Sequence, residues 1–432
     1  MTLRARRWYY SFAILLFLIA APIVVAMAAG WRWQGFRQGF TQTGTLVISA
    51  AQRSEIRLND EVYGTTPKRV SGLVPGTYRL SLHRDGLRAW EHIVTIRPHV
   101  TTTIGPVRLF PMDFTSTTLT TAQANGFTVD ESSRTIASWT TVEDGTDLSL
   151  LWPSTGLVAK NLPAEPTWIR VSPRRQWLAI GLPSSTKIVA LADPTRIQEL
   201  PASGPIAWLT SSENISYQLT NGSIVAHDAL TNLQTTVATG HSFAAVQDTL
   251  WFTTRISDLT SIYQRTGATA AESRLLTSLS GTWTIIGQLG RGIVLDDPTQ
   301  DAIALTTNRL TGRLETTKLE GLTQWPAQST TDHPLWLREA DVVTLNTDLQ
   351  PTVLLRTTEP LMLVDWVEPE HILATATASS VSLRSVSSRQ GRATLLQQSL
   401  PTGTSPLLID PASQSFFLQR DGQLLRLRWT KS

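Results

Sequence analysis

The chain has 432 residues, a formal net charge of +3, 16% charged residues and no cysteine. Its length exceeds what one ordinary hydrophobic core holds, so we expect two or more folded units. The absence of cysteine excludes disulfides, zinc–thiolate sites and a cysteine nucleophile, and the near-balanced charge, with no basic run beyond the N-terminus, argues against a nucleic-acid partner.

The first predicted element is a transmembrane helix over residues 8–30. Three arginines precede it within residues 1–7, and the stretch from Phe12 to Ala29 is almost wholly apolar. About 20 apolar residues in a helix span the hydrocarbon core of a bilayer. Aromatic residues at both ends match the interfacial belts, and basic residues before the span favour a cytoplasmic N-terminus. We therefore expect a single-pass signal anchor in the cell membrane, with residues 1–7 cytoplasmic and the C-terminal domains extracytoplasmic.

A cleaved signal peptide is the alternative for this segment. Ala26-Met27-Ala28 has the small residues of a cleavage site and follows an apolar stretch. That stretch is longer than the usual apolar region of a signal peptide, and its aromatic flanks are typical of an anchor. Under both interpretations the rest of the chain is exported, and the sequence favours the anchor.

Residues 31–43 are predicted to form a linker, and residues 44–110 a small β domain. Short strands with alternating apolar residues begin at Gly44, and Gly, Pro, Asn and Asp residues that favour turns separate them. This pattern predicts a compact all-β module of about 65 residues.

The turns of this module carry a family resemblance. Its motifs are Gly44-Thr-Leu-Val47, Gly64-Thr-Thr-Pro67, Leu73-Val-Pro-Gly-Thr-Tyr78 and Asp85-Gly86. Together they resemble the PEGA domain, a small β-sandwich common on prokaryotic surface proteins. The chain departs from the family pattern at one point. In the family an aromatic residue normally follows the second glycine directly, whereas this chain has Arg88-Ala89-Trp90 there. The resemblance implies a place at the cell surface and no reaction, and an unrelated small β-sandwich is the alternative.

Residues 115–432 show β runs broken by turns, and an aromatic ladder runs through them. Its members recur about every 40 residues, which is the period of a propeller blade. They are Trp168, Trp208, Trp283, Trp325 and Trp366, with Phe127, Phe243 and Leu408 at the remaining positions. We interpret these residues as core that packs between sheets, not as a ligand box.

Several repeats place an apolar strand, a polar turn and a second apolar strand in succession. The copy Ser172-Pro-Arg-Arg-Gln-Trp-Leu-Ala179 resembles the hairpin of TolB-like and WD40-like propeller blades, with Arg174-Arg175 in place of the expected Asp-Gly. We predict a propeller of seven or eight blades. The segment Ser116–Thr121 would complete the last blade beside Leu424–Trp429 and so remove an open edge. Two or three β-sandwiches in tandem are the alternative.

Known catalytic and metal motifs are absent from the sequence. The histidines form no close ligand pair; they are His83, His92, His99, His227, His241, His333 and His371. Two acidic clusters, Glu143–Asp147 and Asp296–Asp301, lack EF-hand spacing, so we interpret them as turns, with calcium sites as the alternative. Only Ser280–Trp283 is similar to the end of a sialidase Asp-box, and its aspartate is missing. The sequence therefore assigns no catalytic, cofactor-binding or metal residue and no cofactor.

The predicted fold class is all-β apart from one N-terminal transmembrane helix, with a small PEGA β-sandwich followed by a seven- or eight-bladed β-propeller. The predicted function is that of a non-catalytic binding or scaffold protein, anchored in the membrane. Its propeller face would bind a cell-wall polymer or an envelope protein, because rigid scaffolds with variable loops commonly supply binding. The alternatives are a glycan-active hydrolase with its site at the propeller centre and a sensory ectodomain that works through a membrane partner.

Overall fold

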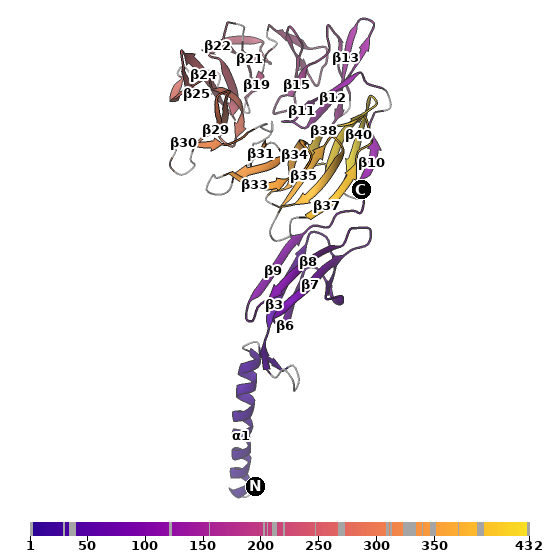
Figure 1. The fold of residues 1–432 in the computed structure, drawn as a ribbon, viewed down its shortest axis with the longest axis vertical. Coiled ribbons are helices and arrows are strands. Elements are labelled where there is room, and N and C mark those ends of the chain that lie inside the picture. Colours follow the sequence, from indigo (N-terminus) through magenta and orange to yellow (C-terminus); the bar gives the residue numbers. More distant parts are fainter. Residues whose placement is uncertain are drawn as a thin grey trace. The chain divides into compact units, whose positions relative to one another are not determined.

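A computed structural model of the chain is shown in Figure 1. It describes all residues except 1–2, 29–30, 34–39, 121–122, 155, 202–203, 205, 210–213, 219–220, 247, 267–272, 308–310, 312, 323–333, 339, 346–350, 370, 387–392 and 430–432. The described residues form two compact units, of which the first extends to Asp113 and the second begins at Phe114. Every described element after the N-terminal helix is a β-strand, as the sequence predicts.

The helix α1 runs from Leu3 to Ala28 and contains Pro22. Large apolar side chains along it, among them Phe12, Phe17 and Val25, are exposed. Across the residues that the structure describes, we find no helix that combines the length and the apolarity needed to cross a membrane. The helix predicted for residues 8–30 is therefore present, and its membrane crossing stays a prediction.

The segment predicted as a linker, residues 31–43, contains a small sheet. Strand β1 (Trp31–Trp33) pairs antiparallel with β2 (Phe40–Gln42). Tryptophan and phenylalanine favour extended backbone, which explains why this stretch forms strands.

The next seven strands form the small domain that follows. They are β3 (Gly44–Ala50), β4 (Glu55–Leu58), β5 (Glu61–Thr65), β6 (Lys68–Leu73), β7 (Gly76–His83), β8 (Trp90–Ile96) and β9 (Thr101–Val107). One sheet has the order β6-β3-β9, with β3 and β9 parallel, and the other has the order β5-β4-β7-β8. Alternate residues of both sheets, such as Leu46, Ile56 and Leu80, point inward and form one buried cluster. The domain is thus a β-sandwich with its own core.

The described residues of the second unit form eight sheets, which we number as blades. Blade 1 comprises β11 (Gly126–Asp130), β12 (Thr135–Val142), β13 (Gly145–Trp152) and β14 (Gly156–Leu162), and blade 2 comprises β15 (Trp168–Val171), β16 (Trp177–Gly181), β17 (Thr186–Ala190) and β18 (Ile197–Leu200). Blade 3 comprises β19 (Ile206–Trp208), β20 (Asn214–Gln218), β21 (Ser223–Asp228) and β22 (Leu233–Thr239), and blade 4 comprises β23 (Ser242–Val246), β24 (Thr249–Ile256), β25 (Leu259–Thr266) and β26 (Arg274–Ser280).

The remaining blades complete the series. Blade 5 comprises β27 (Thr284–Leu289), β28 (Gly292–Asp297), β29 (Gln300–Thr307) and β30 (Leu314–Leu319), and blade 6 comprises β31 (Leu335–Arg338), β32 (Asp341–Leu345) and β33 (Pro351–Arg356). Blade 7 comprises β34 (Leu361–Glu368), β35 (Ile372–Thr377), β36 (Ser380–Ser385) and β37 (Ala393–Ser399), and blade 8 comprises β38 (Thr404–Asp410), β39 (Ser415–Arg420), β40 (Gln423–Arg428) and β10 (Thr115–Thr118).

Buried clusters between consecutive sheets arrange the blades as a ring. One cluster joins blades 1 and 2, another joins blades 2 and 3, and the series continues around the unit. Blade 8 meets blade 1 through Ile136, Leu408 and Phe417. Strand β10 pairs antiparallel with β40, with Thr115 opposite Arg428, so the predicted closure is confirmed. The structure is therefore an eight-bladed propeller.

The aromatic ladder marks the first strands of the blades. All but one of its members lie in a first strand or directly before one. Trp325 lies outside the described residues, so its place in a first strand stays a prediction. Among the described residues blade 6 has the three strands β31 to β33, and residues 323–333 before them are not described.

The strand order fixes which turns share one end of the ring. Consecutive strands within each blade are antiparallel neighbours. Turns between the first and second strands therefore lie at the same end as turns between the third and fourth strands. We call this end the first-turn face.

Candidate functional site

A cavity of about 1130 Å³ lies where the first strands meet, and we call it the central cavity. The first strands β19, β23 and β27 supply one part of its lining. The first turns of blades 8, 1 and 2 supply another part. The cavity therefore borders the first-turn face of the propeller.

Three first turns that line the central cavity share one backbone conformation. Each ends in a residue with positive φ, which is Arg134 at 55°, Arg175 at 56° and Gln414 at 54°. In blade 2 the N–H of Arg175 donates to the carbonyl of Ser172 at 2.8 Å, and the turns of blades 1 and 8 close in the same way. A left-handed conformation suits glycine and strains a residue that carries a side chain.

Asp130 organises the first turn of blade 1. Its side chain has 0% exposure and accepts hydrogen bonds from Ser132 Oγ at 2.6 Å and Ser133 Oγ at 2.7 Å. It also accepts from the backbone N–H of Val171 at 2.8 Å and from Arg170 Nη1 at 3.3 Å. The carboxylate therefore joins blade 1 to blade 2, and the hydrogen bonds leave it no free face toward the cavity.

Asp410 has the corresponding place in blade 8. Its carboxylate accepts from the N–H of Ala412 at 3.1 Å and from Trp152 Nε1 at 3.2 Å, so it joins blade 8 to blade 1. Arg426 stacks over the ring of Trp152 at 4.4 Å. These contacts make Asp410 part of the framework that holds the cavity wall.

Asp365, on β34, forms an ion pair with Arg134 at 2.6 Å. Its pKa is raised above the usual aspartate range, first because the surrounding sheets keep water away and also because Asp410 lies near; Arg134 opposes this rise. The N–H of Trp366 donates to the same carboxyl group at 2.7 Å.

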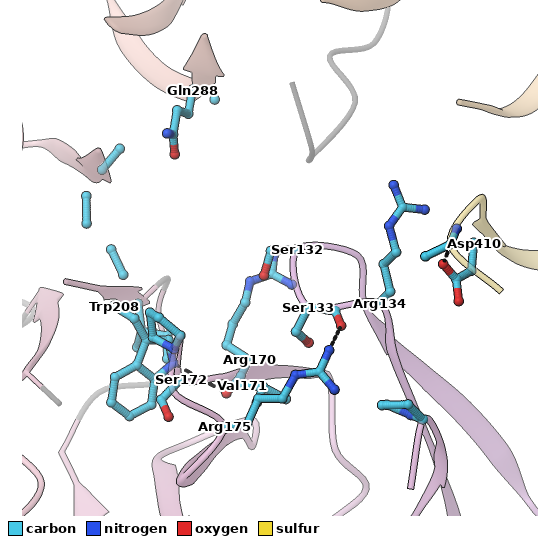
Figure 2. A pocket seen from close by; sticks show the side chains of 18 of the residues that line it. Ser132, Ser133, Arg134, Arg170, Val171, Ser172, Arg175, Trp208, Gln288 and Asp410 are labelled. Atoms are coloured by element: carbon cyan, nitrogen blue, oxygen red, sulfur yellow. Dashed lines mark hydrogen bonds between the residues drawn. The ribbon is translucent and has the colours of Figure 1, made fainter. Parts of the chain in front are cut away.

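Two further arginines line the cavity beside Arg134. Arg170 is 39% exposed in its side chain and is paired to the fully buried Asp130. Arg175 is exposed and donates to the carbonyl of Ser133 at 3.1 Å. Figure 2 shows the three arginines gathered around Ser132 and Ser133.

The first strands of blades 3 to 5 form an apolar wall of the same cavity. It includes Ile206, Trp208, Phe243, Ile285 and Ile286. A β-bulge between Ile285 and Gly287 leaves Ile286 outside the regular pairing of β27, and Ile286 is 41% exposed. Such bulges re-aim a side chain, and here an apolar one is presented to solvent. The cavity thus has a wall rich in cations and an apolar wall.

The β-sandwich is similar in sequence to a known domain family. Residues 43–107 match the family model described as "PEGA domain". These residues are a PEGA domain. The match covers the strands β3 to β9 of the sandwich and confirms the resemblance in the sequence. No curated protein has a sequence that matches this chain.

Solved structures similar to the chain beyond the PEGA domain are remote. An uncharacterized protein from Listeria monocytogenes has 9% identity and a TM-score of 0.42, over 66% of this chain and 95% of that chain. The Dos1 propeller has 8% identity and a TM-score of 0.48, over 74% of this chain and 95% of that chain. An auxiliary nutrient binding protein from Bacteroides thetaiotaomicron has 12% identity and a TM-score of 0.37, over 88% and 91%. The propeller is therefore assigned from the ring of sheets in this chain and not from these similarities.

The histidines and acidic clusters weighed from the sequence lie away from the central cavity, whereas two members of the aromatic ladder interpreted as core, Trp208 and Phe243, line it. His227 is buried in β21, and His333 lies outside the described residues. Asp297 accepts hydrogen bonds from Thr282 and Thr299, so it stabilises a turn. Within the described ranges no group of three or more His, Asp or Glu residues is placed to hold a metal ion.

The sialidase-like fragment Ser280–Trp283 leads into strand β27. Trp283 is buried, and its Nε1 donates to the carbonyl of Ser280 at 2.9 Å. The fragment therefore has a structural role in the turn before β27.

Sequence reasoning did not assign the arginine cluster, although one signal was present. Arg174-Arg175 stands where the blade motif expects Asp-Gly, and a bulky residue at a turn position that suits glycine points to a use for its side chain. The convergence of Arg134, Arg170 and Arg175 could not be read from the sequence, because it depends on how two blades meet.

Proposed function

We propose that the chain is a non-catalytic binding protein of the cell envelope, and that its propeller holds a ligand in the central cavity. The observation that carries this proposal is the lining of that cavity, where guanidinium groups and an apolar wall remain available to a ligand. Ligand sites are commonly concave and mostly apolar, with a few polar groups that fix orientation. The ligand would be a cell-wall polymer or an envelope protein segment.

The state of the carboxylates supports binding over hydrolysis. A glycan-active hydrolase needs two carboxyl groups that flank the scissile bond. Asp410 lines the central cavity and accepts structural hydrogen bonds, and behind the lining Asp130 does the same while Asp365 is paired with Arg134. This use of the carboxylates favours a site that binds and does not cleave.

We further propose that α1 anchors the protein in the cell membrane, with its N-terminus in the cytoplasm and both β units outside. The exposure of Phe12, Phe17 and Val25 supports this, since apolar side chains of that size are stabilised in lipid. Arginines before the helix agree with the proposed orientation.

The binding proposal is tested with the full chain in nanodiscs, mixed with isolated cell-wall polymer or with envelope protein from its source cell. We expect saturable co-sedimentation or capture with one of the two fractions. Ala245→Trp, which fills the central cavity from β23, should abolish it. Val142→Trp, at an exposed turn on the opposite face of the ring, is the matched control and should bind like the wild type. Equal binding by Ala245→Trp would contradict the proposal.

The anchoring proposal has a separate test on native membranes. We expect the protein to stay in the membrane pellet after alkaline carbonate extraction, and protease added outside the cell to digest both β units. Release by carbonate would show that α1 is not inserted.

A further inference from the structure

We propose that the central cavity selects a ligand in which an anionic group, a carboxylate or a phosphate, is attached to an apolar body. This inference rests on the proposed function, because it specifies the ligand of the same cavity. It draws on backbone strain, on the placement of charges and on the apolar wall, each of which is independent of the others.

The strain concerns Arg134 and Arg175. Both have positive φ in turns that glycine would form without steric conflict. Two arginines therefore occupy equivalent positions of adjacent blades against backbone preference. Strained residues persist where their side chains serve a purpose, and these side chains line the central cavity.

The charges are layered, with guanidinium groups toward the ligand and carboxylates behind them. Asp130 has 0% exposure, while its partner Arg170 is 39% exposed in its side chain. Arg175 is exposed, and the structure gives it no carboxylate partner among the described residues. A ligand in the cavity therefore meets N–H donors first. Guanidinium groups bind carboxylates and phosphates in a planar, two-pronged geometry.

The donors of Arg175 are mostly unused. Its hydrogen bond to the carbonyl of Ser133 occupies one nitrogen, Nη2, and guanidinium carries five N–H groups. Arg134 is less available, because its nitrogens bind Asp365 and the carbonyl of Ile409. We therefore assign the main contact with the anion to Arg175, with Arg170 beside it.

The apolar wall accounts for the second half of the ligand. Trp208 lies next to the arginine cluster, since its Nε1 donates to the carbonyl of Arg170 at 3.4 Å. Phe243 and the bulged Ile286 extend the apolar surface away from that point. Across the space from the arginines, Gln288 offers a neutral polar group (Figure 2). A small inorganic anion would leave this wall unused, so the lining favours a ligand with an apolar body.

The test compares probes that vary the anionic group and the apolar body, with the full chain in nanodiscs and isothermal titration as the readout. The carboxylate probe is 4-phenylbutyrate, its uncharged match is 4-phenylbutyramide, and acetate supplies the anion without the body. Phenyl phosphate replaces the carboxylate by a phosphate and separates the two sources of anionic charge. We expect 4-phenylbutyrate or phenyl phosphate to bind at least about tenfold more tightly than the amide or acetate, and the difference to shrink as salt is added.

The deciding variant is Arg175→Gly, which removes the cation and relieves the backbone strain. We expect it to lose the preference for the charged probe while its melting temperature stays equal or rises, because glycine fits positive φ. Ser257→Gly makes the same backbone change at φ 56° in the β24–β25 turn, on the opposite face, and should leave binding unchanged.

The outcomes separate this inference from the proposed function. If Arg175→Gly binds the charged probes like the wild type, or if the amide binds as well as the acid, the anionic selectivity is wrong. The same holds if no probe binds. In each of these cases the proposed function would still hold if the wild type binds the envelope fraction and Ala245→Trp does not. If the wild type binds neither the probes nor the envelope fractions, the anionic selectivity and the proposed function are both wrong.

Discussion

Tryptophan faces glycine across the first two strands of blades 1 and 2. Gly126 is opposite Trp139, and Gly181 is opposite Trp168. In each pair the indole lies over the glycine, so that a Cβ built at residue 181 would lie 2.1 Å from Cε2 of Trp168. The absence of a side chain at these glycines therefore sets the position of the rings that pack between neighbouring blades.

We predict that Gly181→Ala destabilises the propeller by about 1–3 kcal/mol, because an added methyl group overpacks a filled site. Urea denaturation measures the free energy of unfolding. Gly156→Ala is the control, since a Cβ there meets nothing within 4 Å. Combining Gly181→Ala with Trp168→Leu should recover part of the loss, and additive effects would contradict the steric explanation.

His227 is a fully buried residue with a single hydrogen-bond partner in the described part of the chain. Its Nε2 lies 2.7 Å from Oε1 of Gln198, and its Nδ1 is buried with no hydrogen-bond partner there. Burial lowers the pKa of His227, and the neighbouring Asp228 opposes that shift. Folding therefore favours the neutral form of this imidazole over the charged form.

A dependence of stability on pH follows from His227. As the pH falls below about 6.5, the unfolded chain takes up a proton on this histidine before the folded protein does. Above that pH, His227 makes its full contribution to the free energy of unfolding. This contribution is lost as the pH falls toward the lower pKa that His227 has in the folded protein. We expect the melting temperature to fall between pH 7 and pH 5, and to fall less in His227→Gln. An identical pH profile for the variant would show that other groups cause the change.

At the scale of elements, strand β10 closes the ring by pairing with β40. The N–H of Leu119 donates to the carbonyl of Leu424 at 2.8 Å. Hydrogen-bonded pairs alternate along an antiparallel ladder, so Thr117, opposite Arg426, directs its N–H at β40. The N–H of Thr118 faces outward by the same alternation.

We predict that Thr117→Pro lowers the free energy of unfolding by about 1–3 kcal/mol, because it removes a hydrogen bond of the closing ladder. Thr118→Pro removes an N–H that faces away from β40 and should have a much smaller effect. Thermal unfolding followed by circular dichroism compares the two. Similar losses for both prolines would mean that backbone rigidity, not the closing bond, decides the effect.

Several elements could be predicted from the sequence because their signals are local. The ladder from Phe127 to Leu408 repeats with the blades, and polar turns mark the hairpins between first and second strands. The strand that the spacing predicts around Trp325 in blade 6 stays a prediction, because Trp325 lies outside the described residues. The central cavity could not be predicted, since its arginines come together only through the packing of blades.

At the scale of the whole molecule, the PEGA domain and the propeller each have a hydrophobic core. The cluster that contains Leu80 draws all its residues from the sandwich and the few residues after it. Ile293 belongs to a cluster between blades 4 and 5. A unit with its own core can unfold by itself.

We therefore expect two transitions in scanning calorimetry of the full chain. Leu80→Ala should lower only the PEGA transition, and Ile293→Ala only the propeller transition, each by about 2–5 kcal/mol in stability, because both side chains are fully buried. A single transition that both substitutions shift equally would show that the two units unfold together.

The closure of blade 8 also sets an order in time during synthesis. Leu424, which bonds Thr120 beside the closing strand, lies 304 residues further along the chain. At roughly 5–20 residues per second, β10 waits about 15 to 60 s before its partner strand is made. Throughout that interval the ring stays open, with unpaired strand edges of the kind that invite aggregation. A chaperone that holds the growing chain would have its greatest effect in that interval, and it would become dispensable once β40 pairs with β10.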